Sequence, residues 1–122
     1  MIELLKQLIA IPSTSREEGA AADCLQKWME AAGLDVHRTL NNVWVESEPK
    51  GLKPTILLNA HIDTVKPASA YTRDPFAPVL EGDRLYGLGS NDDGGSLVAL
   101  LEAYKVLSSR PQPRRKSAAR TA

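Results

Sequence analysis

The sequence predicts an α/β protein, a partial three-layer αβα sandwich in which helices cover the strands. Three observations predict this class. Apolar residues recur at helical spacing near both ends of the folded part, they alternate with polar residues in a hairpin between them, and they form one short uninterrupted run. With 122 residues, the chain has room for one domain of ordinary size.

Two helices are expected first. One covers residues 1–10, where apolar side chains recur every three or four positions. The second covers residues 16–32, because Ser15 and Glu18 have the spacing of a capping box, in which each side chain bonds to the backbone N–H of the other residue. Gly33 then supplies the left-handed residue that commonly ends a helix.

The remaining elements are expected to be strands, turns and one more helix. Residues 34–45 alternate as a hairpin with a turn at Asn41-Asn42. The apolar run of residues 55–60 predicts a buried, parallel, central strand. A small hairpin turns at residues 81–83, and helical spacing returns over residues 96–107.

Composition excludes several classes of protein. Hydrophobic residues make up 43% of the chain and charged residues 25%, as in a folded soluble domain. A single cysteine excludes an internal disulfide, and no apolar run is long enough to cross a bilayer. No basic face marks a nucleic-acid-binding domain. We therefore expect a cytoplasmic protein without nucleic-acid or membrane partners.

The C-terminal segment has a different character. Residues 105–122 contain basic residues and no acidic one, and residues 108–122 lack large apolar side chains. Such a segment cannot bury enough surface to offset its ordering. We expect a folded domain over residues 1–107 and a basic, disordered tail over residues 108–122, with a polar turn at residues 50–54.

Two candidate functional residues follow the apolar run. In an extended chain, His61 and Asp63 point to the same side, into one site. Histidine is a common zinc ligand, and a metal-bound imidazole usually donates its second N–H to a carboxylate. A histidine paired with an aspartate for stability alone is the other interpretation.

A second candidate cluster lies in the glycine-rich loop of residues 87–95. The carboxylates of Asp92 and Asp93 would repel a phosphate group. The third glycine of a dinucleotide-binding motif is also missing, so the sequence does not indicate a nucleotide site in this loop. A carboxylate here could bridge two divalent metals or cap the helix that follows. We expect Asp93 to be the cap.

These motifs, in their order, resemble the zinc-dependent amidohydrolase family that contains acetylornithine deacetylase, succinyl-diaminopimelate desuccinylase, aminoacylases and related carboxypeptidases. The amino-acid sequences of the glycine-rich loop and of the Asn-Asn-Val-Trp turn look most like those of the acetylornithine deacetylase branch, including members that remove succinyl groups. The stretches that carry the resemblance are Ile11-Pro12-Ser13 with Ser15, residues 58–65, Asp74-Pro75-Phe76, residues 85–89 and Asn91-Asp92.

The resemblance implies roles for particular residues. His61 would be a ligand of one metal, Asp63 its catalytic partner, and Asp92 the carboxylate that bridges two zinc ions, for which cobalt could substitute. It also implies a cis peptide bond between Asp92 and Asp93, a fold that is part of a zinc-peptidase-like catalytic domain, and hydrolysis of a small N-acyl amino acid. Acetylornithine, in arginine biosynthesis, is the expected substrate.

The chain differs from the family mainly in its length. The resemblance covers residues 2–104 and is expected to fail after Tyr104. No residue of the chain matches the family's general-base glutamate or its remaining metal ligands. We therefore expect the N-terminal portion of a truncated or frameshifted enzyme, inactive by itself and self-associating through an exposed sheet edge. The alternative is a non-catalytic metal-binding or interaction fragment.

Overall fold

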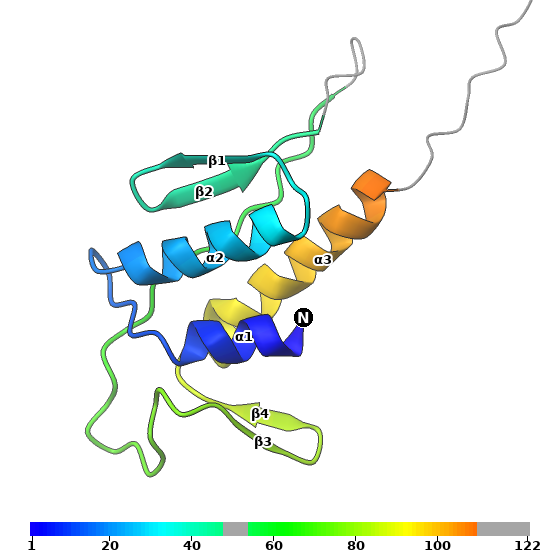
Figure 1. The fold of residues 1–122 in the computed structure, drawn as a ribbon. Helices are drawn as coiled ribbons and strands as arrows, with labels where there is room; N and C mark the ends of the chain where they lie inside the picture. The colour runs from blue at the N-terminus through cyan, green and yellow to red at the C-terminus, as the bar shows by residue number, and fades with distance from the viewer. Residues whose placement is uncertain (48–53, 110–122) are drawn as a thin grey trace, which may run out of the picture.

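The computed structural model describes residues 1–47 and 54–109 as three α-helices packed together, with a β-hairpin on either side (Figure 1). The elements are α1 (Ile2–Ile9), α2 (Gly19–Ala31), β1 (Val36–Thr39), β2 (Asn42–Val45), β3 (Val79–Glu81), β4 (Arg84–Tyr86), the irregular helical turn η1 (Ser90–Gly94) and α3 (Gly95–Ser109). This mixture of helices and small sheets confirms the predicted α/β class and is consistent with part of a larger α/β domain.

The core lies where the three helices meet. Buried apolar side chains from each helix form one cluster, onto which the inner faces of the first hairpin and of residues 60–62 pack. The cluster consists of Leu4, Leu25, Met29, Leu97, Val98 and Leu101. Burying such side chains is the main force that stabilises this fold, because each contributes roughly 1.5–3 kcal/mol relative to exposure.

The first hairpin confirms the expected alternation but shifts its turn by one position. β1 and β2 pair in antiparallel register, with Val36 opposite Val45 and Thr39 opposite Asn42. The two-residue turn is therefore Leu40-Asn41, and the expectation of a turn at Asn41-Asn42 was wrong. The position that needs a left-handed backbone is filled by Leu40, with φ at 55°.

The second hairpin forms where it was predicted, but its turn is one residue shorter than expected, because Glu81 belongs to β3. β3 and β4 pair with Glu81 opposite Arg84, which leaves Gly82 and Asp83 in the turn, and Gly82 has a φ of 60°. Arg73, which precedes the hairpin, contacts both of its strands. Its guanidinium donates two hydrogen bonds to the Glu81 carboxylate and lies over the ring of Tyr86.

The expectation of a buried central strand at residues 55–60 was wrong. Residues 54–63 form no strand, residues 54–59 are exposed, and Ile56 and Leu57 are each 83% exposed. A parallel strand needs a neighbouring strand for its backbone hydrogen bonds and a covering layer for its apolar side chains. Neither is supplied to this segment by the described residues.

The capping box was also wrong. α2 begins at Gly19, its N-cap residue is Glu18, and no side chain caps it. Ser15 and Glu18 instead make other contacts, because the hydroxyl of Ser15 bonds to Asp63 and the Glu18 carboxylate accepts from the Arg16 backbone N–H and from Asn41. These polar partners from elsewhere in the fold replace the local capping pattern.

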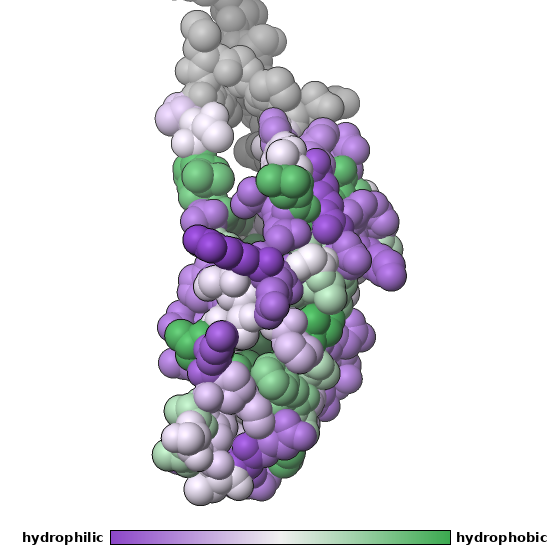
Figure 2. Space-filling view, turned by 90° about the vertical axis from the view of Figure 1, so that its left-hand side faces the viewer, coloured by the Kyte–Doolittle hydropathy of each residue, from purple (hydrophilic) through white to green (hydrophobic). Residues whose placement is uncertain are grey.

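The last helix is longer than the sequence predicts. α3 continues to Ser109, two residues into the segment expected to be the tail, while residues 110–122 and most of the expected turn at 50–54 lie outside the described residues. On the face drawn in Figure 2, apolar side chains form separate groups among hydrophilic ones. Within the described ranges, no helix has the length and apolarity needed to span a bilayer.

Candidate metal centre

The segment that carries His61 and Asp63 is tied to the loop between α1 and α2. The backbone N–H of Thr64 donates to the Ser13 carbonyl at 2.8 Å, and Thr14 and Thr64 form an isolated parallel bridge. The hydroxyl of Ser13, a residue that is only 3% exposed, donates to the carbonyl of Ile62 at 3.0 Å. These bonds fix the backbone on both sides of Asp63.

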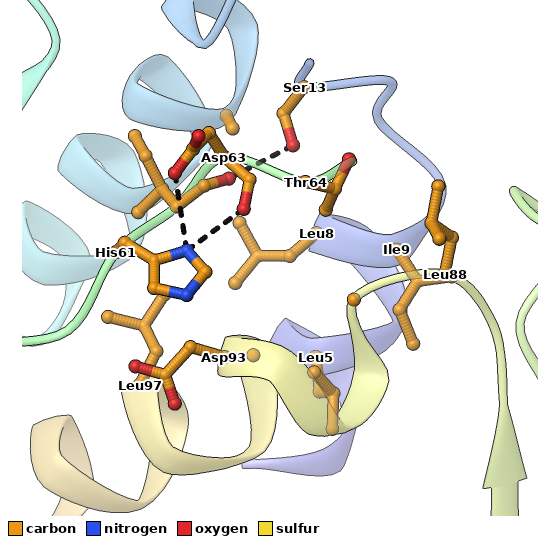
Figure 3. Close-up of a pocket in the computed structure, with 14 residues that line it drawn as sticks. Leu5, Leu8, Ile9, Ser13, His61, Asp63, Thr64, Leu88, Asp93 and Leu97 are labelled. Carbon is orange, nitrogen blue, oxygen red and sulfur yellow. Dashed lines mark hydrogen bonds and ion pairs between the residues drawn. The ribbon is translucent and has the colours of Figure 1, made fainter. Parts of the chain in front are cut away.

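His61 and Asp63 lie against each other, as the sequence predicts (Figure 3). The Nδ1 atom of His61 is 3.0 Å from the backbone carbonyl oxygen of Asp63 and 3.2 Å from the Oδ1 atom of the Asp63 side chain. Both oxygens are acceptors, so an Nδ1–H would donate to Asp63. The opposite nitrogen, Nε2, then carries the lone pair that a metal would need.

Asp92 approaches this second nitrogen from a different part of the chain. Its Oδ1 lies 3.0 Å from Nε2 of His61, which confirms the expectation that these two residues are close. Asp92 belongs to η1, where Asp92 and Asp93 both have non-helical backbone angles, and the peptide bond between them is cis, as the resemblance implies. The Asp92 side chain is 89% exposed, so its second oxygen is accessible to a further ligand.

Two pKa shifts follow from these contacts. The hydrogen bond with Asp92 raises the pKa of His61 above its ordinary value, and the contacts with Asp63 act in the same direction. The hydrogen bond from Ser15 lowers the pKa of Asp63, and the neighbouring His61 adds to this. A charged carboxylate therefore faces the imidazole over the neutral pH range.

An open cleft of about 350 Å³ borders these groups. Its lining includes His61, Asp63 and their neighbours, and the residues of the loop that follows β4, among them Asp92. Beneath His61 lies a much smaller cavity of about 20 Å³, whose walls are mainly apolar side chains from α1, α3 and Leu88 (Figure 3). The site thus has an apolar floor and a polar mouth, as ligand sites commonly do.

The role of Asp93 as the cap of the last helix stays a prediction. Asp93 has a non-helical backbone, with φ at −122°, and lies just before α3, but among the described residues its side chain makes no hydrogen bond to the helix. Gly89, at the start of η1, has a φ of 74°, and a Cβ there would lie 2.7 Å from the side chain of Thr64, so a glycine is needed at this point. Asp93 also lines the small cavity beneath His61.

The donor set fits part of a metal site. Zinc bonds to histidine nitrogen and carboxylate oxygen of about 2.1 Å can span the 3.0 Å between Nε2 of His61 and Oδ1 of Asp92. Within residues 1–47 and 54–109, however, no three His, Cys, Asp or Glu side chains form a group that could hold an ion. A catalytic zinc site normally has three protein ligands, and His61 and Asp92 would supply two of them.

The contact between Ser15 and Asp63 and the place of Tyr71 in the wall of the cleft are not predictable from local sequence patterns. Ser15 has the spacing of a helix cap, and nothing in the loop before α2 indicates that it lies beside Asp63, 48 positions away. Tyr71 lies in a proline-containing stretch without periodicity, which carries no signal of burial or orientation.

Comparisons with known proteins identify the family of the chain. The profile of peptidase family M20/M25/M40 matches residues 57–118, a range that includes His61, Asp63 and Asp92. The chain belongs to this family. The match continues beyond Tyr104, so the expectation that the resemblance fails there was wrong. Enzymes of this family generally use divalent metals.

The chain is similar to curated relatives that share one name. The chain is 33% identical to a succinyl-diaminopimelate desuccinylase of Sphingopyxis alaskensis over 114 residues, which cover 84% of this chain and 29% of that protein. It is 30% identical to the enzyme of the same name from Xylella fastidiosa over 119 residues, 92% of this chain and 31% of that protein. The chain thus spans less than a third of the length of these relatives. The expectation that acetylornithine deacetylase is the nearest branch is not confirmed by them.

Proposed function

We propose that this chain contributes a metal-binding portion to a hydrolase that cleaves the N-acyl amide of an amino acid. The observation that carries the proposal is the 3.0 Å approach of His61 Nε2 and Asp92 Oδ1 at the edge of an open cleft. In this proposal His61 and Asp92 are ligands, zinc is the metal with cobalt as a substitute, and Asp63 orients the imidazole.

For the substrate, we propose an N-succinyl amino acid in place of acetylornithine. The proposal is supported by the relatives, which are named succinyl-diaminopimelate desuccinylases and match most of this chain. The choice of a succinyl over an acetyl group is based on these relatives.

The chain's own residues would prepare the site. A bound divalent metal lowers the pKa of a coordinated water and polarises a carbonyl oxygen. The Asp63 carboxylate would keep the proton of His61 on Nδ1, and the exposed Asp92 carboxylate could offer one oxygen to each of two ions. The cleft that these residues border is open and would admit a small amide.

Zinc titration calorimetry of the full chain tests the metal site. We expect binding of the unsubstituted chain that is weakened at least tenfold by His61→Ala and by Asp92→Ala. The matched control is His37→Ala, because His37 is the other histidine of the sequence and stacks on Trp44, away from the cleft. Equal zinc affinity of the His61→Ala variant and the unsubstituted chain would contradict the proposal.

Hydrolysis assays test what the chain does with this site. With N-succinyl-diaminopimelate or N-acetylornithine and added zinc, we expect no turnover by the 122-residue chain alone, since the residues that the structure describes would supply two of the usual three ligands. Turnover that needs zinc and disappears in His61→Ala would show that the chain forms a complete site, for instance by pairing. In that case the preferred substrate would also decide between the two acyl groups.

A further inference from the structure

The position of His61 and Asp63 depends on a loop and not on a sheet. The residues directly before them, 54–60, form no strand, so they provide no rigid support. The bonds to Ser13 and Thr14 hold residues 62–64 instead, and Ser13 is buried. The loop that precedes α2 is therefore the structural support of the part of the candidate metal centre that carries His61 and Asp63.

Ser15 extends this support from the backbone to the Asp63 carboxylate. Its Oγ donates to Oδ2 of Asp63 at 2.5 Å, while Oδ1 of the same carboxylate lies 3.2 Å from Nδ1 of His61. The carboxylate is thus held from both ends. Since its side chain is 37% exposed, loss of the Ser15 bond would leave Oδ2 to water and let the carboxylate rotate.

Acceptors on both sides of the ring compete for the proton of a neutral His61. The backbone carbonyl oxygen and Oδ1 of Asp63 lie 3.0 Å and 3.2 Å from Nδ1, and Oδ1 of Asp92 lies 3.0 Å from Nε2. A neutral imidazole has one N–H, and the hydrogen bond at one nitrogen decides which nitrogen keeps a free lone pair. Whatever fixes the Asp63 carboxylate therefore biases this choice.

We propose that Ser15 is a positioning residue, which holds the Asp63 carboxylate so that His61 keeps its proton on Nδ1 and presents Nε2 to the metal. The inference rests on the proposed function, in which Nε2 of His61 is the ligand atom. Ser15 acts through Asp63, and its own hydroxyl needs no contact with metal or substrate.

The test is the tautomer of His61 in the metal-free full chain. Two-bond proton–nitrogen NMR correlation, recorded at a pH where the imidazole is neutral, distinguishes Nδ1–H from Nε2–H. We expect Ser15→Ala to lower the fraction of the Nδ1–H form and Ser15→Thr, which keeps the hydroxyl, to restore it. Thr14→Ala is the matched control, because the Thr14 hydroxyl bonds to Glu17 in the same loop and not to Asp63.

The outcomes separate this inference from the proposed function. An unchanged tautomer in Ser15→Ala, or an equal change in Thr14→Ala, would overturn the role of Ser15. Zinc titration of the same variants adds a second measure, and we expect Ser15→Ala to weaken binding by less than the roughly 10-fold to 100-fold typical of a direct partner of a ligand. If the unsubstituted chain binds no zinc, the metal proposal fails, while the tautomer result still decides the role of Ser15.

Discussion

The Nε2 atom of His61 lies 3.0 Å from Oδ1 of Asp92, although 31 positions separate the two residues in the sequence. His61 is held by the loop before α2, and Asp92 lies in η1, which contacts both α1 and α3. The pair therefore depends on how the helices pack as much as on the two side chains. Substitutions in the core and in the glycine-rich loop should therefore both alter the contact between His61 and Asp92.

Removing the charge of Asp92 should lower the pKa of His61. The hydrogen bond with Asp92 is the largest cause of the raised His61 pKa, so Asp92→Asn should move it towards its ordinary value. NMR titration of the imidazole in chelator-treated protein measures this shift. Asp83→Asn, in the turn of the second hairpin, is the control, and an unchanged His61 pKa in Asp92→Asn would contradict the geometry.

The same shift sets the sign of a pH effect on folding. Because the folded-state pKa of His61 is raised, the stabilisation is fully present below the unfolded pKa and is lost as the pH rises through the folded pKa. Urea unfolding on both sides of this window should show a smaller pH dependence in Asp92→Asn than in the unsubstituted chain.

Truncating a core side chain of α1 should destabilise the fold strongly. Leu4 is 2% exposed and belongs to the central cluster, so Leu4→Ala should lower the free energy of unfolding by about 2–5 kcal/mol. Ile2→Ala, in the same helix but at a residue that is 50% exposed, should change it by no more than about 0.5 kcal/mol. Equal urea midpoints for the two variants would argue against the described packing.

A methyl group at Gly94 should distort the loop that carries Asp92. A Cβ there would lie 2.6 Å from the carbonyl oxygen of Gly89 and 2.7 Å from the side chain of Leu5. We expect Gly94→Ala to cost about 1–3 kcal/mol of stability and to alter the His61 imidazole signals. Gly19→Ala, at the start of α2, has its nearest neighbour at 3.8 Å and should be neutral or stabilising in thermal unfolding.

The exposed apolar segment should promote association between copies of the chain. Ile56 and Leu57 are each 83% exposed in a stretch whose backbone pairs with no strand among the described residues. Such segments are templates for pairing with another chain. Sedimentation velocity should show concentration-dependent oligomers that Leu57→Lys reduces. A chain that stays monomeric at high concentration would refute this prediction.

Local sequence patterns were sufficient for the helices and hairpins. The apolar spacing of residues 2–9 and 97–104 and the alternation around the two hairpin turns predict elements that the structure contains, within two or three residues. These elements depend on interactions between near neighbours, such as hydrogen bonds four residues apart and cross-strand pairs beside a tight turn. The histidine and aspartate motifs likewise identified His61, Asp63 and Asp92, which border the cleft.

Long-range contacts decided the rest. The apolar run at residues 55–60 has the composition of a central strand, yet a strand forms only where a neighbour supplies hydrogen bonds, and the described residues supply none. The Ser15–Glu18 pair has the spacing of a cap, but Asp63 and Asn41, brought in by the fold, are its partners. The sequence by itself determined which groups could react, whereas the tertiary structure decided which of them touch, because hydrogen-bond partners distant in sequence become available only after the helices have packed.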